Sequence, residues 1–180
     1  PFIVFEDADI DAAIEGALAS KYRNAGQTCV CSNRFLVQSS IYDEFAEKLT
    51  QRVNKFTMGD GTQDGVTIGP LVNVQAAEAM EELVTDAVDA GAKLVAGGKR
   101  SDLGVCFFEP TILSEVTMNM TVAADEIFGP IAPLIRFETE EEAIAIANDT
   151  VFGLASYIYT RDIGRIWRVS EALEYGMVGI

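Results

Sequence analysis

The sequence contains no histidine, and only 3 of its 180 residues are cysteine. A thiol in this chain must therefore be activated without a neighbouring imidazole. An odd number of cysteines does not form a disulfide framework in a chain of this size, which favours a reducing compartment such as the cytoplasm. A C-x-C pair with no histidine and no second cysteine pair supplies too few soft ligands for a metal, so we expect no metal site.

Basic residues are also scarce, with 13 Lys and Arg against 28 Asp and Glu and a net charge of -15. Such a surface repels nucleic acid and anionic membranes, so we expect neither as a partner. A small anionic substrate remains compatible with this charge if a local arginine receives it. No apolar run approaches the roughly 20 residues of a membrane-spanning helix, and the start does not resemble a signal peptide.

The composition is that of a globular protein, with 49% hydrophobic and 23% charged residues, and it shows neither a linker nor an internal repeat. We expect a single domain over residues 1–180. The chain begins without Met at "PFIVFEDADID" and stops inside the apolar run "EYGMVGI". These ends indicate an internal piece of a longer enzyme.

Strand-like apolar runs alternate with segments of helical spacing along the whole chain. This rhythm predicts an α/β fold, a three-layer sandwich in which helices cover both faces of a mostly parallel sheet. The expected strands are 2–6, 34–38, 92–98, 130–137, 154–160 and 176–180, and the expected helices are 9–24, 39–56, 76–90, 140–149 and 162–173.

Three segments carry more specific expectations. Residues 99–129 show no regular pattern and receive no predicted element. Pro130 and Pro133 lack the N–H that a sheet ladder uses, so we expect the strand at 130–137 to pair only through its later part. In the last helix we expect Ile163 and Trp167 to point into the core.

The stretch "RNAGQTCVCSNR" at residues 23–34 is the strongest candidate for chemistry. Cys29 follows a helix-to-loop transition rich in small residues, whose exposed backbone N–H groups stabilise a thiolate and an oxyanion. The alternative is a small core residue, which is also how we interpret Cys106. Cys31 is a possible redox partner of Cys29, although a disulfide between them would be strained, and a packed thiol is the alternative.

The motifs "NAGQTCVCSNR", "ADEIFGP" and "NDTVFGL" resemble the aldehyde dehydrogenase superfamily, and "RNAGQTCVC" with "EALEYGMVGI" is most similar to its succinate-semialdehyde branch. The resemblance covers the whole chain and implies the fold of that family's catalytic domain. It implies that Cys29 attacks an aldehyde, that hydride leaves to NAD or NADP, and that water hydrolyses the resulting thioester. It also implies that Glu126 binds the ribose beside the nicotinamide and that Phe128 packs near that ring.

The resemblance further implies that Arg23 contacts the distal carboxylate of the substrate. This favours succinate semialdehyde over glutarate semialdehyde and simple aliphatic aldehydes. Lys21 and Arg34 are nearby basic residues that we expect at the surface.

In the family, the water-activating glutamate, the cofactor-binding domain and the C-terminal oligomerisation segment lie outside the part that this chain matches. We therefore expect the chain alone to be incapable of turnover, and the parent enzyme to be a homo-oligomer, either a dimer or a tetramer. Two other functions stay open from the residues alone. One is a non-catalytic thiol switch using Cys29 and Cys31, and the other is a thiol acyltransferase or esterase.

Overall fold

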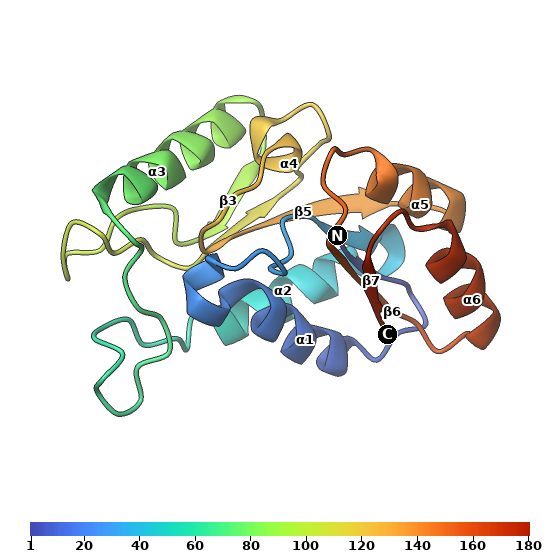
Figure 1. Ribbon diagram of the computed structural model, residues 1–180, viewed down its shortest axis with the longest axis horizontal. Coiled ribbons are helices and arrows are strands. Elements are labelled where there is room, and N and C mark those ends of the chain that lie inside the picture. Colours follow the sequence, from blue (N-terminus) through green and yellow to red (C-terminus); the bar gives the residue numbers. More distant parts are fainter.

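The computed structural model describes residues 1–180 without a gap and contains one seven-stranded sheet in the order β3-β4-β5-β2-β1-β6-β7. Every neighbouring pair is parallel except β3 and β4 at one edge, which confirms the predicted mostly parallel sheet (Figure 1). The strands are β1 (Phe2–Val4), β2 (Phe35–Gln38), β3 (Lys93–Ala96), β4 (Thr111–Ser114), β5 (Ile131–Phe137), β6 (Ala155–Tyr159) and β7 (Met177–Gly179).

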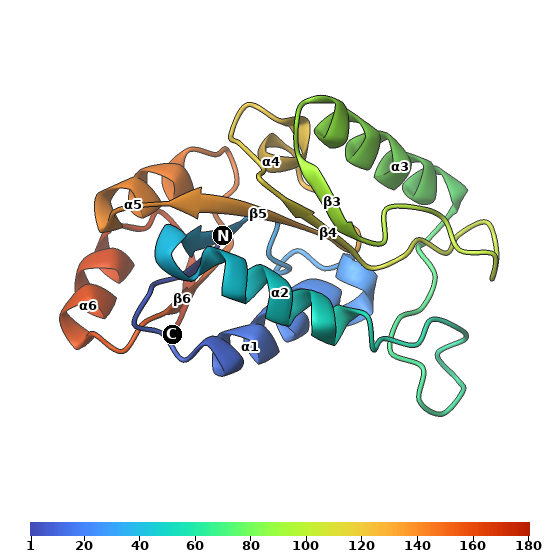
Figure 2. The ribbon, with the colours of Figure 1, turned by 180° about the vertical axis from the view of Figure 1, so that it is seen from behind.

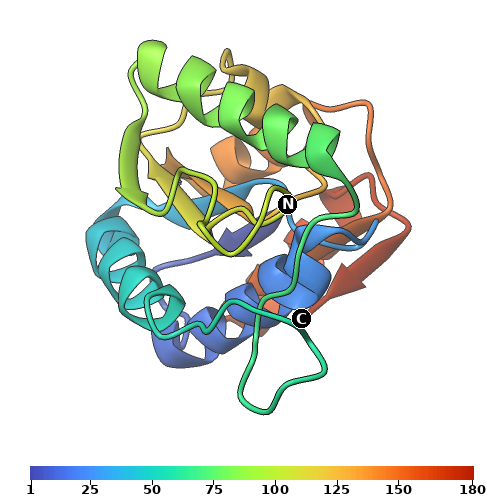
Figure 3. The same cartoon turned by 90° about the vertical axis from the view of Figure 1, so that its left-hand side faces the viewer.

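The helices form two layers, one on each side of the sheet. In Figures 1 and 2, α1 and α2 lie together below the sheet, whereas α3 and α4 lie above it, and α5 and α6 pair with each other at one end. Figure 3 shows the connection between α2 and α3 extending away from the sheet. The helices are α1 (Ile10–Tyr22), α2 (Tyr42–Val53), α3 (Val74–Asp89), α4 (Thr121–Ala124), α5 (Glu140–Asn148) and α6 (Ile163–Ala172).

The central strands are buried on both faces, which is why their sequences are continuous apolar runs instead of alternating ones. All three residues of β1 and the first three of β2 are at most 1% exposed. On α1, Ile14, Ala17 and Leu18 recur at helical spacing and face this sheet. None of the helices combines the length and the apolar character that a membrane crossing requires.

Two elements were missed in the segment without a regular pattern. β4 has only four residues, Thr111–Ser114, and all are buried, so its short sequence has neither alternation nor length to mark it as a strand. α4 is a single turn. The expectation for Pro133 was also wrong, because β5 pairs with β4 through residues 131–133 and with β2 through residues 134–137. The strand changes partner directly after the proline.

The expectation for α6 was wrong as well, since Ile163 is 69% exposed and Trp167 is 64% exposed. The side that α6 turns toward the domain carries Val169, which is fully buried, together with Arg165. The rotation of α6 about its axis is therefore set by the ion pair of Arg165 together with the burial of Val169.

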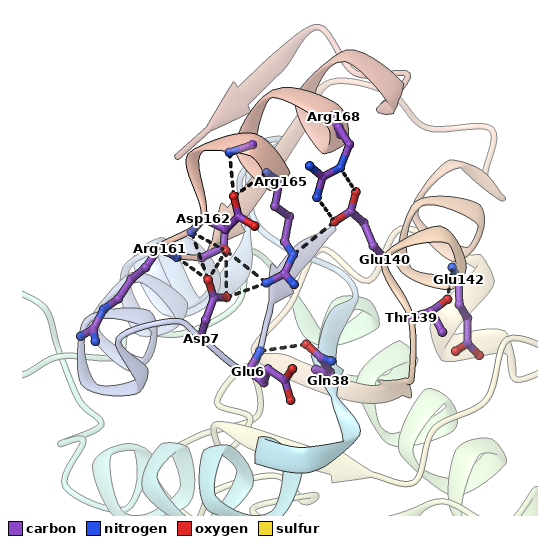
Figure 4. Close-up of polar contacts among 12 residues, drawn as sticks. Glu6, Asp7, Gln38, Thr139, Glu140, Glu142, Arg161, Asp162, Arg165 and Arg168 are labelled. Atoms are coloured by element: carbon purple, nitrogen blue, oxygen red, sulfur yellow. Dashed lines mark hydrogen bonds and ion pairs between the residues drawn. The ribbon is translucent and has the colours of Figure 1, made fainter.

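A cluster of charged residues joins α5 and α6 to the end of β1 (Figure 4). Arg165 donates to Asp7 at 2.7 Å and to Glu140 at 3.2 Å, and its guanidinium lies 4.6 Å from the ring centre of Phe5. Arg168 donates to both oxygens of Glu140, at 2.7 and 2.8 Å. Because Asp7 follows β1 and Glu140 begins α5, these contacts fix the carboxyl end of the sheet.

Both carboxylates of this cluster are held in their charged form. Burial alone would raise the pKa of Asp7, but hydrogen bonds from Thr160 and the N–H of Arg161 and the charge of Arg165 lower it below its usual 3.8. A hydrogen bond from Arg168, opposed by burial, lowers the pKa of Glu140 below its usual 4.5. The unfolded chain therefore binds these protons at higher pH than the folded chain, and stability is lost as the pH falls through the two folded-state values.

Replacing Arg165 by methionine (Arg165→Met) keeps much of the apolar stem but removes the partner of two partly buried carboxylates. We expect the free energy of unfolding at pH 7 to fall by about 2 kcal/mol, and the difference from the parent protein to shrink in acid, where Asp7 and Glu140 are protonated. Urea unfolding at neutral and acidic pH measures this. Arg161→Met is the matched control, because Arg161 is 69% exposed; an equal loss in both variants would contradict the account.

Candidate functional site

The candidate site is a cavity of about 140 Å³ formed by the segments that precede the strands. Its lining includes residues from the segments that lead into β1, β2, β5, β6 and β7. Because these strands are parallel, their amino ends share one edge of the sheet. The residues concerned are Pro1, Cys29, Cys31, Asn33, Arg34, Ala123, Ala124, Asp125, Glu126, Thr150, Phe152, Gly153, Leu154, Ala155 and Tyr175.

The chain reaches this cavity through a left-handed turn after α1. Asn24, Ala25 and Gly26 have φ of 52°, 53° and 78°, a conformation that ends the helix and reverses the chain. The side-chain amide of Asn24 donates to the carbonyl of Gln27, and that of Gln27 donates to the carbonyl of Asn24, each at 3.1 Å. These two bonds offset part of the strain of left-handed residues that have a Cβ.

Gly26 packs directly against the backbone of Gly129. A Cβ at position 26 would overlap the carbonyl oxygen of Gly129, so only glycine fits this contact. Gln27 braces the same turn, because its Oε1 accepts from the N–H of Val72 at 2.8 Å. The two motifs singled out in the sequence, about a hundred residues apart, therefore meet through one glycine of each.

Cys29 lies at the tip of the segment that follows, with an exposed side chain and a free thiol. On one side of it, the N–H of Cys31 donates to the carbonyl of Thr28 at 3.0 Å. On the other side, the hydroxyl of Tyr157 donates to the carbonyl of Val30 at 2.8 Å. No hydrogen bond within the chain uses the N–H of Cys29. The segment thus holds a thiol and a free N–H donor together at the cavity.

Cys31 lines the same cavity and is half-buried, with its sulfur 2.7 Å from the hydroxyl oxygen of Thr28 and 3.9 Å from the carbonyl oxygen of Arg23. All three cysteines are free. Cys106 is half-buried instead of enclosed in the core as expected.

Glu126 shares the cavity with Cys29, and it forms no ion pair. Its carboxylate is therefore available to a ligand. Phe128 lies outside the cavity lining, has a φ of 49° and is 44% exposed. This left-handed phenylalanine directly precedes Gly129, so its conformation is part of the contact with the cysteine turn. No three His, Cys, Asp or Glu side chains lie close enough together to hold a metal ion.

Arg23 does not line the cavity of Cys29. It is exposed, forms no ion pair, and lines a neighbouring hollow together with Tyr157 and Tyr159 of β6. Burial raises the pKa of Tyr157, and the charge of Arg23 opposes that shift. Arg23 and Glu126 thus face different hollows beside the cysteine segment.

The expectation that Lys21 and Arg34 lie at the surface was wrong. Arg34 is buried and donates to the carbonyl oxygens of Ile146, Ala147 and Asp149 at 2.8 to 3.2 Å, so its charge caps the carbonyl end of α5.

Lys21 is completely buried, and its Nζ has no hydrogen-bond partner. Burial lowers its pKa to about 7, and the charge of Cys31 opposes that shift. The sequence held a signal for this burial, because Lys21 follows Ile14, Ala17 and Leu18 at the spacing of the buried helix face.

The family model described as "Aldehyde dehydrogenase family" matches residues 1–180. The chain is 59% identical over its full length to the NADP(+) succinate-semialdehyde dehydrogenase of Escherichia coli (strain K12) and 59% identical to the glutarate-semialdehyde dehydrogenase of Pseudomonas aeruginosa, and it covers 37% of each. The crystal structure of succinate-semialdehyde dehydrogenase from Burkholderia pseudomallei superimposes with a TM-score of 0.99 at 61% identity, over 100% of this chain and 37% of that one. The chain thus spans little more than a third of the length of these relatives.

Gly26→Ala tests the contact between the two motifs. The new Cβ must displace the backbone of Gly129, and alanine is strained in the left-handed conformation of residue 26. We therefore expect the free energy of unfolding to fall by at least about 2 kcal/mol. We also expect the alkylation rate of Cys29 to change, because the turn that presents it shifts. Gly61→Ala is the control, since no atom lies within 4 Å of a Cβ there. A fully stable Gly26→Ala with unchanged Cys29 alkylation would show that the contact is dispensable.

Proposed function

Because the chain belongs to the aldehyde dehydrogenase family, we propose that the whole protein oxidises a semialdehyde with a distal carboxylate to the acid, using NAD or NADP. The observation that carries this proposal is the exposed Cys29 thiol beside its free N–H, on a turn packed against the segment that bears Glu126. A nucleophile and an oxyanion donor at one point are what acyl chemistry on an aldehyde requires.

In the proposed reaction the Cys29 thiolate forms a bond to the aldehyde carbon, and the electron pair of the C=O bond moves to oxygen. In this proposal the N–H of Cys29, which no other group in the chain uses, donates to that oxyanion, and a fixed donor of this kind is worth about 3 kcal/mol to the transition state. The nicotinamide cofactor supplies the hydride acceptor when it is bound. A thioester then remains on Cys29, and water breaks its C–S bond to release the acid and the thiolate.

Two further residues receive roles in this proposal. Glu126 would hold the ribose hydroxyls of the cofactor, for which its unpaired carboxylate in the Cys29 cavity fits, with Phe128 beside the ring. Arg23 would bind the substrate carboxylate, and its position in a different hollow from Glu126 is compatible with substrate and cofactor approaching the thiol from different sides. The free guanidinium of Arg23 offers a bidentate contact in a chain of net charge -15.

We place succinate semialdehyde ahead of glutarate semialdehyde as the substrate. The relatives named for these two compounds are equally similar to the chain, at 59% identity. The two substrates differ by one methylene between aldehyde and carboxylate. The distance between the Cys29 thiol and the Arg23 guanidinium therefore decides which of them fits. We also propose that the whole protein is located in the cytoplasm and forms a homo-oligomer. Turnover is proposed to depend on segments beyond residues 1–180.

Cys29→Ser in the full-length protein tests the nucleophile. A hydroxyl without an adjacent base is a far weaker nucleophile than a thiolate, so we expect kcat for succinate semialdehyde to fall by at least about 1000-fold. Cofactor reduction followed by absorbance measures the rate, and Cys106→Ser, outside the cavity, is the control. Retained oxidation in Cys29→Ser would exclude this mechanism, and thioester hydrolysis without cofactor would instead indicate an acyltransferase or esterase.

Arg23→Met tests the carboxylate contact. We expect kcat/KM for succinate semialdehyde to fall by about 10- to 100-fold, the value of a charged hydrogen-bonded pair, while kcat/KM for an uncharged aliphatic aldehyde stays within about twofold. Arg161→Met, an exposed arginine at the carboxyl end of the sheet, should change neither value. An equal loss for charged and uncharged aldehydes would assign Arg23 to the structure of the turn instead.

A further inference from the structure

Tyr157 of β6 contacts the segment that carries Cys29, although the two lie far apart in the sequence. Its hydroxyl donates to the carbonyl oxygen of Val30 at 2.8 Å, across 127 positions of the chain. The side chain is half-buried and comes from the sheet, whereas Val30 directly follows the thiol. The reaction described above gives this hydroxyl no role.

The peptide unit between Val30 and Cys31 is held at both of its polar ends. Its carbonyl accepts from Tyr157, and its N–H, that of Cys31, donates to the carbonyl of Thr28 at 3.0 Å. The second of these bonds closes a β-turn over residues 28–31 in which Cys29 occupies the second position. The turn does not use the N–H of its second residue. Tyr157 therefore braces the turn that leaves both the thiol and the N–H of Cys29 free.

The ring of Tyr157 is itself fixed by its neighbours in the sheet. Phe2 of β1 and Gly179 of β7 pair with Tyr157 from its two sides. The ring centres of Phe2 and Tyr157 lie 6.0 Å apart, and a Cβ at Gly179 would lie only 2.9 Å from Cδ1 of Tyr157. Packing thus determines where the hydroxyl points, so it can hold the turn in one conformation.

The position of Tyr157 allows two roles for its hydroxyl to be compared. Its ring lines the hollow of Arg23, where the hydroxyl could contact a substrate carboxylate, whereas its hydrogen bond goes to the cysteine turn. A phenol has a single O–H to donate, and Val30 already accepts it. Burial raises the pKa of Tyr157 above its usual 10.0, so the hydroxyl keeps this proton at neutral pH. The contacts therefore favour the bracing of the turn.

We propose, building on the proposed function, that Tyr157 is a positioning residue for Cys29, whose hydroxyl holds the turn so that the sulfur and the N–H of Cys29 face the aldehyde together. Tyr157 touches neither the substrate nor the cofactor in this role. Because the N–H binds the oxyanion only as it forms, a loosened turn weakens the transition state more than the bound substrate.

Tyr157→Phe in the full-length protein tests this role, because phenylalanine keeps the ring and its packing and removes only the hydroxyl. We expect kcat and kcat/KM to fall together by about 10- to 100-fold, with KM within about twofold. The loss should be the same for succinate semialdehyde and for an uncharged aliphatic aldehyde. Ser156→Ala is the matched control, because it removes another hydroxyl of β6, one that donates to the carbonyl of Met177 at 3.2 Å. It should change kcat by less than about twofold.

Three results would overturn the proposal. One is an unchanged kcat in Tyr157→Phe. Another is a loss confined to succinate semialdehyde, which would assign the hydroxyl to the substrate carboxylate. The third is an equal loss in Ser156→Ala, which would show that any weakening of β6 slows the enzyme.

Alkylation of Cys29 by iodoacetamide separates a failure of this proposal from a failure of the proposed function, because it needs no turnover. Mass spectrometry that resolves the modified residue follows the rate at pH 7. We expect Tyr157→Phe to slow addition at Cys29 by at least about threefold and to change the rate at Cys106, outside the cavity, by less than about twofold. A rate at Cys29 that is unchanged or faster would refute the role of Tyr157, whether or not the protein oxidises aldehydes.

Discussion

The candidate site depends on one backbone contact, between Gly26 and the carbonyl oxygen of Gly129. A left-handed turn at residues 24–26 ends α1, and this contact fixes where the turn points. The thiol of Cys29, its free N–H and the carboxylate of Glu126 are placed by the two segments that meet there. A side chain at Gly26 would force the two segments apart, whereas one at Gly129 would meet the side chain of Met80.

The site lies at the amino ends of the parallel strands, whereas open α/β sheets most often bind ligands at the carboxyl ends. In this protein, the carboxyl ends of β1 and β5 are joined by the ion pairs of Asp7, Arg165, Glu140 and Arg168 (Figure 4). At the amino end, Arg34 caps the carbonyl end of α5 and so holds one wall of the cavity. The ion-pair cluster thus lies at the carboxyl end of the sheet, and the Cys29 cavity lies at the amino end.

Much of the fold could be predicted from the sequence, because continuous apolar strands and helical spacing follow from local periodicity. The short β4 was missed since four buried residues carry no periodic signal. The exposed Trp167 was misplaced because an ion pair on another face of α6 sets its rotation.

In the site, the motifs singled out Cys29 and Glu126, and the structure brings both to one cavity, while their roles stay predictions. It did not reveal the buried cations, because the contacts of Lys21 and Arg34 come from segments distant in sequence or from the packing of the whole layer. Periodicity carried part of this information, since Lys21 continues the buried face of α1. A charged residue on an apolar stripe can therefore be buried together with the rest of that stripe.

The most direct measurement is to trap the covalent intermediate. The full-length protein is mixed with succinate semialdehyde and cofactor, quenched in acid, digested and sequenced by mass spectrometry. The account predicts a succinyl thioester in the peptide of residues 23–34, attached to Cys29 and dependent on cofactor. Turnover with no acyl group on that peptide, or with the acyl group on a different residue, would contradict it.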